Sequence, residues 1–399
     1  MSRLDRRDLL KISSAVPFLG GAEALAADGK KESVGATDDA PRGKKGILTR
    51  MPSLDLESQV DYLTGHGKWA AAMAAESTKR SEDILRAHGI DPNKRTDMTL
   101  KDIIPLLEND PVIAMKSRLG SINHYKAFTS LQRYFHNNAD YYLSTLKAAE
   151  KKGPGALDLN RSLVVPDYTK HEIHNQIGGY SGDPFAGMIY FYGTLTLFDA
   201  KNEQDAGFDA TAAAVPVPSD GKVRRILDNG TGPGQFATSL KRRFPDAEVW
   251  GIDVSGPMVR YAHHRANQMG VNVNFANRLA EDNGFPDNYF DIVVSTSFHH
   301  ELTAEASKKV FMEAQRTLRK GGVYRPADSG INGYPQTPLG KVNTYLAWRQ
   351  NHEVWMMEWA EMDRLGAIAA AGLKLDASGA FGGNGAPWLT TINVAARKV

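Results

Sequence analysis

The sequence predicts a doubly wound α/β fold preceded by a helical N-terminal domain. From Val223 onward, short β-type runs alternate with helical stretches, which implies βαβ units and a mostly parallel sheet. A glycine-rich turn, GTGPG at residues 230–234, follows the first of these runs. Helical periodicity of apolar residues between Leu54 and Lys152 predicts the helices of the N-terminal domain.

Length and composition limit the number of domains and the classes of function to consider. A chain of 399 residues is long enough for two folded units. The 48 basic and 46 acidic residues nearly cancel, so nothing in the charge points to a nucleic-acid partner. The chain has no cysteine, which excludes disulfides, thiolate metal ligands and a cysteine nucleophile.

The first residues resemble an export signal. Arg6 and Arg7 precede an apolar stretch, Ile12 to Gly21, and the cleavage pattern Ala24-Leu25-Ala26 follows. This order predicts a twin-arginine (Tat) signal peptide over residues 1–27 and a periplasmic location. A short amphipathic helix and a cytoplasmic location are the alternatives. The stretch is too short to predict stable membrane insertion.

Residues 28–50 contain little apolar surface to bury, which predicts a flexible linker. Residues 51–200 are predicted as a helical N-terminal and lid region. Breaks in the helical pattern are expected at Gly65 to Gly67, Gly89 to Pro92 and Asp110-Pro111. The stretch Leu157 to Phe198 is aromatic, rich in glycine and histidine, and poor in helical periodicity, so it is expected to form a loop over a site. Packing between the two domains is the alternative role.

Residues 201–399 are predicted as the α/β domain. Its first four strands are expected at Val223 to Leu227, Glu248 to Ile252, Val271 to Phe275 and Ile292 to Ser295. Helices are expected at Phe236 to Phe244, at Met258 to Met269, and from Thr303 to a stop at Gly321. The aromatic stretch Asn343 to Trp359 follows, where either core packing or contact with a substrate is expected.

The glycine turn indicates a bound cofactor. Gly230, Gly232 and Gly234 let the backbone bend without a Cβ clash and approach a ligand at the carboxyl end of the first strand. The run GPGQFA also satisfies the dinucleotide fingerprint. Asp228, however, stands just before the turn, where a carboxylate would repel a phosphate and attract an ammonium group. This favours S-adenosylmethionine over a nicotinamide cofactor.

Asp253 ends the second predicted strand, at the spacing expected for an acid that binds ribose hydroxyls. The alternative role for Asp253 is a cap for the helix that follows Ser255.

These features resemble class I S-adenosylmethionine-dependent methyltransferases of the small-molecule type, related to those of ubiquinone biosynthesis. The resemblance covers about Val223 to Lys398 and rests on four stretches in order: LDNGTGPG, GIDVS, FPDNYFDIVVSTSFHHEL and TLRKGG. It implies a Rossmann-like seven-stranded sheet whose last strand, expected at Trp388 to Ala396, runs antiparallel. It also implies that Ala280 lies beside the adenine and Thr296 near the methionine part of the cofactor, S-adenosyl-L-methionine.

One position departs from the family pattern. Leu279 stands where such enzymes usually have an aspartate or asparagine that accepts a hydrogen bond from the adenine amine. Loss of that bond weakens adenine binding without excluding it, because a hydrogen bond contributes only about 1 kcal/mol net. Asn277 or Asp282 is the candidate substitute.

His300 and His299, expected in the loop after the fourth strand, are the candidate catalytic residues. A histidine titrates near neutral pH and can remove a proton from a hydroxyl group, although either residue could instead brace the loop. His171 and His174 form an H-x-x-H pair, but no third ligand follows at a known spacing and no helix is evident. The sequence therefore predicts no metal site.

The resulting prediction is an enzyme that transfers a methyl group from S-adenosyl-L-methionine to a small-molecule acceptor. A nicotinamide-dependent oxidoreductase and a non-catalytic S-adenosylmethionine-binding protein are the alternatives. An exported methyltransferase poses a problem, because S-adenosylmethionine is made in the cytosol. The acceptor, the methylated atom and the oligomeric state stay open.

Overall fold

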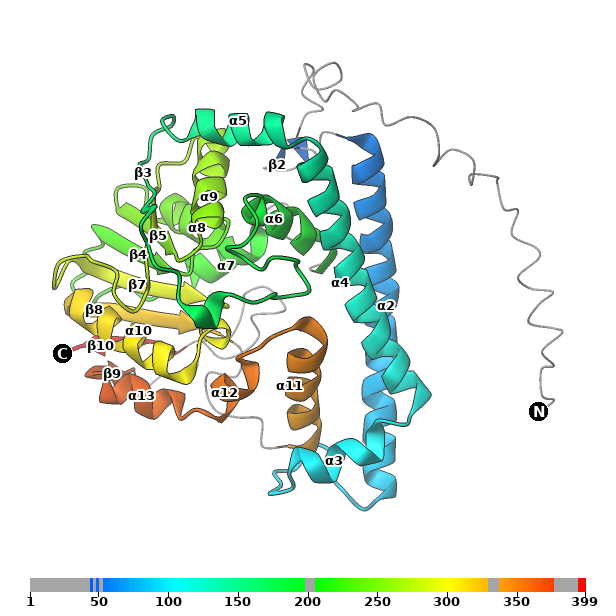
Figure 1. The fold of residues 1–399 in the computed structure, drawn as a ribbon. Coiled ribbons are helices and arrows are strands. Elements are labelled where there is room, and N and C mark those ends of the chain that lie inside the picture. The colour runs from blue at the N-terminus through cyan, green and yellow to red at the C-terminus, as the bar shows by residue number, and fades with distance from the viewer. Residues whose placement is uncertain (1–43, 46–47, 50–52, 198–204, 329–336, 377–393) are drawn as a thin grey trace, which may run out of the picture. The chain divides into compact units, whose positions relative to one another are not determined.

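A computed structural model describes residues 44–45, 48–49, 53–197, 205–328, 337–376 and 394–399 (Figure 1). The predicted signal peptide lies outside these residues, as does most of the predicted linker. Within the linker stretch, β1 (Lys44–Lys45) pairs antiparallel with β2 (Leu48–Thr49). None of the described helices is long and apolar enough to cross a membrane.

The α/β part is built on one mixed sheet with the order β3-β6-β5-β4-β7-β8-β10-β9. Its central strands are β4 (Arg225–Asn229), β5 (Glu248–Asp253), β6 (Asn274–Asn277), β7 (Phe290–Thr296) and β8 (Leu318–Ala327), and their pairings are parallel. The strand order reverses at β4, the first strand of the α/β part in the chain, as a doubly wound Rossmann-like fold requires.

The prediction of seven strands is wrong by one. The additional strand, β3 (Leu157–Asp158), comes from the segment upstream of the α/β part and pairs parallel with β6 at the edge of the sheet. The N–H group of Phe275 in β6 donates to the carbonyl of Ala156, at 2.8 Å. An edge strand presents unpaired backbone groups, and this short segment satisfies some of them.

The antiparallel last strand is confirmed, at a position later than predicted. It is β10 (Ala396–Lys398), which pairs antiparallel with β8 and with β9 (Leu373–Leu375). Of the predicted range, Trp388 to Ala396, only Ala396 belongs to β10, and residues 388–393 lie outside the described part.

Helices cover both faces of the sheet (Figure 1). On one face pack α7 (Ala206–Ala213), α8 (Gln235–Arg243) and α9 (Gly256–Met269), whose apolar side chains share a core with the strands. On the other face pack α10 (Ala304–Thr317), α12 (Met356–Glu361) and α13 (Arg364–Ala370). Helix α10 begins after its N-cap Thr303, as predicted, but ends at Thr317. The predicted stop, Gly321, lies within β8 at φ +73°.

The N-terminal helices are α2 (Leu54–Ala87), α3 (Leu100–Leu107), α4 (Pro111–Asn137) and α5 (Ala139–Ala149). The break expected at Gly65 to Gly67 is wrong, because α2 runs through both glycines. The packing of α2 against α4 and α6 outweighs the intrinsic cost of glycine, roughly 1 kcal/mol per residue. The break expected at Asp110-Pro111 is confirmed: Asp110 is the N-cap of α4 and accepts from the N–H groups of Val112 and Ile113.

The stretch expected to be a loop over a site contains a helix, α6 (Ala186–Leu197). It shows no amphipathic period because it is apolar around most of its circumference. Its residues Met188, Ile189 and Phe191 are all buried between the N-terminal helices and α9. A helix buried on all sides has no polar face, so a search for periodicity misses it.

The part of that stretch before α6 is irregular apart from β3 and a 3-10 turn, η2 (Asp167–Thr169). Helix α11 (Pro338–Asn351) follows β8 and packs on α3 and α4. The irregular stretch and this helix carry residues that line the cavity described next.

Candidate functional site

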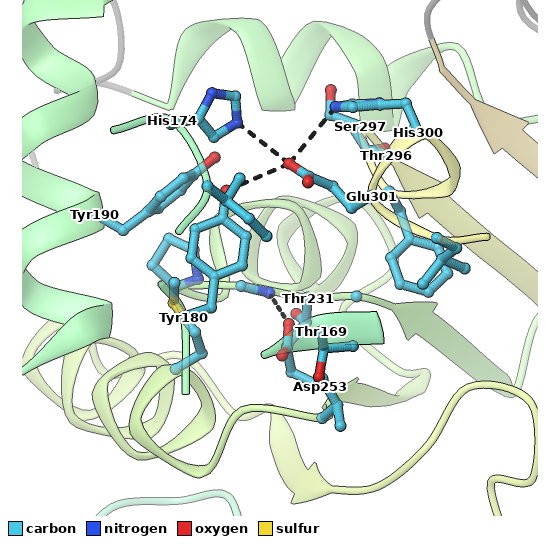
Figure 2. Close-up of a pocket in the computed structure, with 18 of the residues that line it drawn as sticks. Thr169, His174, Tyr180, Tyr190, Thr231, Asp253, Thr296, Ser297, His300 and Glu301 are labelled. Carbon is cyan, nitrogen blue, oxygen red and sulfur yellow. Dashed lines mark hydrogen bonds and ion pairs between the residues drawn. The ribbon is translucent and has the colours of Figure 1, made fainter. Parts of the chain in front are cut away.

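A cavity of about 470 Å³ lies at the carboxyl ends of β4, β5 and β7. One wall is the glycine turn and the strand ends, and the facing wall comes from the segment before α6, from α6 itself and from the residue stretch after α11. Figure 2 shows residues of both walls. Ligands of doubly wound sheets bind at this position, where the strand order reverses.

The glycine turn needs glycine for two different reasons. Gly230, Gly232 and Gly234 all have positive φ, at +66°, +51° and +76°. A Cβ atom on Gly230 would lie 2.1 Å from a ring carbon of Phe298, and one on Gly234 would lie 2.8 Å from the ring of Phe275. A Cβ on Gly232 would meet no atom within 4 Å, so this residue presents bare backbone to the cavity.

Asp228 is buried directly before this turn and lines the cavity. Its Oδ2 accepts a hydrogen bond from the Thr231 hydroxyl at 2.8 Å. Burial raises the pKa of Asp228 to about 7, and the neighbouring charge of Asp253 adds to this effect. A cation bound beside Asp228 would stabilise the carboxylate and lower that pKa again.

Asp253 stands at the end of β5 and also lines the cavity (Figure 2). Its carboxylate accepts from the N–H of Gly232 at 3.0 Å and from the N–H of Ser255 at 2.9 Å. Burial raises its pKa to about 6. The cap of α9 is Ser255, whose Oγ accepts from the N–H of Met258, so the alternative role of Asp253 as helix cap is taken by another residue.

Thr296 lines the cavity at the end of β7, and its Oγ1 is buried with no hydrogen-bond partner among the described residues. A buried polar atom without a protein partner can hydrogen-bond to a polar group of a bound ligand. Ala280 is buried against Leu302 and Ala306 and is not among the residues that line the cavity.

Neither suggested substitute for the missing adenine contact, Asn277 or Asp282, lines this cavity. Asn277 donates its amide hydrogens to the carbonyls of Asp253 and Val254, at 3.1 and 2.7 Å, and it lines a separate, shallower cavity. Asp282 is exposed.

The two candidate catalytic histidines occupy different environments. His299 is fully buried outside the cavity: its ring stacks on that of Trp359 with centroids 5.3 Å apart, and Nε2 lies 2.9 Å from the Tyr324 hydroxyl. Burial lowers the pKa of His299 to about 4. The structure therefore gives His299 a packing position, away from the reacting groups.

His300 lines the cavity. Its Nδ1 lies 2.5 Å from Oδ1 of Asp328. Burial lowers the pKa of His300, but the charge and hydrogen bond of Asp328 outweigh burial, and with Glu353 and Glu301 they raise the pKa to about 10. The other ring nitrogen, Nε2, points toward Glu301 and Glu353, at 3.7 and 3.6 Å.

The structure adds three residues that the sequence did not single out as a group: Glu301, Glu353 and Asp328. Figure 2 shows the Glu301 carboxylate between the rings of His174 and His300. His174 Nε2 lies 3.2 Å from Glu301 Oε1, and His174 Nδ1 lies 3.1 Å from Glu353 Oε1. Only the adjacency of Glu301 to His300 could have been noticed beforehand, because Glu353 and Asp328 belong to distant segments.

The rest of the wall is aromatic. Tyr180 and Tyr190 face each other edge to face with ring centroids 5.3 Å apart, and the Tyr180 hydroxyl lies 3.4 Å from Glu301 Oε1. His171, the first histidine of the H-x-x-H pair, is not part of this group: its ring lies against Trp355, and its Nε2 is buried without a hydrogen-bond partner among the described residues.

Comparison with known proteins agrees with this geometry. Residues 226–322 match a family described as "Methyltransferase domain". A demethylmenaquinone methyltransferase of Thermus thermophilus is 37% identical over 110 residues, which are 27% of this chain and 49% of that protein. A fatty-acid O-methyltransferase of Mycolicibacterium smegmatis is 31% identical over 152 residues, 38% of this chain and 51% of that protein.

A ubiquinone/menaquinone biosynthesis C-methyltransferase of Cupriavidus metallidurans is 29% identical over 136 residues, 33% of this chain and 55% of that protein. The chain thus spans about half the length of these relatives. The matches support a class I methyltransferase domain with S-adenosyl-L-methionine as its cofactor, and they confirm the cofactor prediction.

Proposed function

We propose that this chain is an enzyme that transfers a methyl group from S-adenosyl-L-methionine to a small-molecule acceptor. The observation that carries the proposal is a pair of carboxylates, the buried Asp228 and the half-buried Asp253, which line one cavity together with the glycine turn. The matched domain of residues 226–322 supports the same reading.

Each part of the turn has a proposed role. Asp228 holds the ammonium group of the cofactor, because a buried carboxylate attracts a cation more strongly than an exposed one does. Asp253 accepts from the ribose hydroxyls, and the backbone of Gly230 and Gly232 lies against the ligand. Thr296 contacts the methionine part, and Ala280 and Gly234 support the pocket from behind, since neither lines the cavity directly.

The cofactor supplies an electrophilic methyl group when bound. Methyl transfer is a displacement at carbon that depends mainly on alignment and on removal of water. Tyr180, Tyr190, Phe298 and Met356 line the cavity, and their proposed role is to exclude water when the ligands are bound. The acceptor therefore enters the half of the cavity that lies between the two tyrosines and the glycine turn.

His300 is the proposed residue that contacts the acceptor. With a pKa raised to about 10, its ring is an imidazolium at neutral pH. A cation at this place favours an acceptor whose oxygen is deprotonated, such as a phenolate or an enolate, because a charge-assisted hydrogen bond stabilises the anion. The quinone-related and fatty-acid substrates in the names of the relatives are of this oxygen-bearing kind. His299 is proposed to brace the loop.

The test is direct. Purified full-length chain is titrated with S-adenosylhomocysteine and separately with NAD⁺ in a calorimeter. It is then incubated with methyl-labelled S-adenosylmethionine and a panel of phenols, hydroquinones and long-chain carboxylic acids. Saturable S-adenosylhomocysteine binding and labelled product support the proposal. Preference for NAD⁺ would point to an oxidoreductase, and tight S-adenosylhomocysteine binding without product from any acceptor would point to a non-catalytic binding protein.

Two further features stay proposals. We propose that residues 51–200 act as a helical lid region over the domain of residues 201–399, and that residues 1–27 direct Tat export to the periplasm. Cell fractionation with sequencing of the mature N-terminus tests the second. A mature chain that begins near Ala27 in the periplasm supports export, whereas a full-length cytoplasmic chain contradicts it.

A further inference from the structure

The acceptor half of the cavity contains an arrangement that methyl transfer does not by itself require. Two imidazoles and two carboxylates, from His174, His300, Glu301 and Glu353, meet there, and one ligand atom from each lies within 4.8 Å of every other. They come from three segments far apart in the sequence: the stretch before α6, the loop after β7, and the loop between α11 and α12.

The spacing of these atoms suits a metal ion. Bonds of about 2.1 Å from nitrogen or oxygen to a metal place neighbouring ligand atoms roughly 3.0–3.4 Å apart. The observed separations are 3.2 Å between His174 Nε2 and Glu301 Oε1, and 3.6 Å between His300 Nε2 and Glu353 Oε2. His300 Nε2 lies 3.7 Å from Glu301 Oε1, and all four ligand atoms lie within 4.8 Å of one another, so rotation of the side chains must close the larger separations around one ion.

A second observation points to a missing ligand. Glu353 is buried, with an exposed fraction of 5%, yet its Oε2 has no hydrogen-bond partner among the described residues. Oε2 of Glu301 is buried and unpartnered in the same way. Buried carboxylate oxygens normally accept hydrogen bonds or coordinate a cation, because an uncompensated buried charge is costly. The cationic His300 Nε2 is 3.6 Å from Glu353 Oε2 and beyond hydrogen-bond distance, so both Oε2 atoms are available to coordinate a cation.

His300 is held as metal-binding histidines are. Its Nδ1 lies 2.5 Å from Asp328 Oδ1, which fixes the ring and leaves Nε2 directed at the two glutamates. The other oxygen of Asp328 accepts from the backbone N–H groups of Phe298, His299 and His300, at 2.9, 2.6 and 3.3 Å. Histidine ligands almost always donate their second nitrogen to a carboxylate or carbonyl in this manner.

The backbone has an uncommon left-handed conformation in two of the segments that carry the proposed ligands. His174 has φ +54°, and His352, the residue before Glu353, has φ +52°. A left-handed conformation is uncommon for residues other than glycine and persists where the surroundings enforce it, often at functional sites. Here the amide of Asn175 donates to the carbonyl of Gln350 at 3.1 Å, which ties the two segments together beside the cluster.

We propose that His174, His300, Glu301 and Glu353 bind one divalent first-row transition-metal ion, of the Zn²⁺ or Mn²⁺ class, in the acceptor half of the cavity. Imidazole nitrogens favour such ions over Mg²⁺ and Ca²⁺, which prefer oxygen ligands throughout. The ion displaces the proton that Nε2 of His300 carries in the metal-free protein, and the two carboxylates balance the charge of the ion. If the proposed function holds, on which this last step rests, the bound ion replaces the protonated His300 ring as the group at which the acceptor oxygen docks.

The test measures metal binding without methyl transfer. Full-length chain is treated with a chelator, dialysed, and titrated with ZnCl₂, MnCl₂, MgCl₂ and CaCl₂ in a calorimeter, and CoCl₂ is followed by its visible absorption. We expect one Zn²⁺ or Mn²⁺ per chain, with Mg²⁺ and Ca²⁺ at least tenfold weaker. Glu353→Gln and His300→Ala are expected to weaken binding of the preferred ion at least tenfold.

Controls separate the possible failures. Glu361→Gln and His88→Ala change exposed residues outside the cluster and are expected to bind the ion like the unmodified chain. Circular dichroism checks that each variant folds, and the isosteric Glu301→Gln replaces any that does not. No saturable binding of Zn²⁺, Mn²⁺ or Co²⁺, or equal binding by all variants, overturns the proposal. S-adenosylhomocysteine binding is measured in parallel, so loss of the metal site and failure of the proposed function are distinguishable.

Discussion

Asp328 holds His300 by a hydrogen bond of 2.5 Å from Nδ1 to Oδ1, while three backbone N–H groups donate to the second oxygen of the same carboxylate. This pair fixes both the orientation and the charge of the one candidate catalytic histidine that lines the cavity.

Removing the charge of Asp328 should lower the pKa of His300. Asp328 is the main group that raises that pKa to about 10 against the opposing effect of burial. In Asp328→Asn, burial then dominates, and we expect the imidazole to titrate at least about two pH units lower. NMR titration of the ring in metal-free protein, assigned with a His300→Gln variant, measures this. Asp167→Asn, an exposed control, should leave the His300 titration unchanged, and an unchanged titration in Asp328→Asn contradicts the assignment.

Replacing Asp228 by asparagine should weaken binding of S-adenosylhomocysteine. The proposed ammonium contact is a charge-assisted hydrogen bond, worth about 1.5–3 kcal/mol, which corresponds to roughly a 10- to 100-fold loss of affinity. Calorimetric titration gives the dissociation constant. Asp287→Asn removes a carboxylate that is 69% exposed and should bind as the unmodified chain does. Equal affinities for Asp228→Asn and the control would remove the electrostatic basis of the cofactor assignment.

The affinity for S-adenosylhomocysteine should fall as the pH drops. Burial raises the pKa of Asp228 to about 7 and that of Asp253 to about 6 in the ligand-free protein. A bound ammonium group lowers the pKa of Asp228, so protons are released on binding, and the affinity is fully present above about pH 7 and is lost below it. Calorimetry from about pH 8 to about pH 5 tests this. Asp228→Asn should flatten the profile above about pH 6, and a flat profile in the unmodified chain would show that neither carboxyl group binds the ligand.

Gly230→Ala should destabilise the fold more than Gly221→Ala does. Both glycines have similar φ, +66° and +69°, so the conformational penalty, about 1–2 kcal/mol, is shared. Only at Gly230 does the new Cβ meet another residue, 2.1 Å from the Phe298 ring, whereas Gly221 faces open space. Denaturant unfolding measures the difference. Equal free energies of unfolding for the two variants would mean that Phe298 moves aside without cost.

Replacing His299 and replacing His300 should have different effects on stability and activity. His299→Ala removes a buried ring and leaves the Tyr324 hydroxyl and Ser307 without that partner, so we expect a loss of roughly 3–5 kcal/mol in the free energy of unfolding. His300→Ala leaves the buried Asp328 carboxylate without its ring partner and should also lower the free energy of unfolding, but of the two variants only this one should reduce methyl transfer beyond the loss of folded protein, because the His300 ring lines the cavity. Denaturation curves combined with initial rates separate the effects. A fully active His300→Ala variant would exclude His300 from the reaction.

The sequence predicted the sheet well where local signals are strong and less well elsewhere. The strands at Glu248–Asp253 and Phe290–Thr296 are apolar runs bounded by turn residues, and their predicted ranges agree within two residues at each end. Helix α6 was missed because burial on all sides removes the periodicity on which prediction depends. Strand β3 was missed because a two-residue strand is determined by its neighbour, β6, and not by its own residues.

For the candidate site, the residues proposed to bind the cofactor could be predicted from the sequence, whereas the cluster proposed to face the acceptor could not. The glycine turn, Asp228 and Asp253 are local: each follows a strand, and parallel strands bring their ends to one edge of the sheet. His174, Glu353 and Asp328 reach His300 from separate segments, and nothing in their own neighbourhoods marks them as partners. Only the packing of two segments against the sheet, the stretch before α6 and the residues that follow α11, decides which of these titratable side chains meet. That packing sets the distances between them, on which their charges and any bound ligand depend.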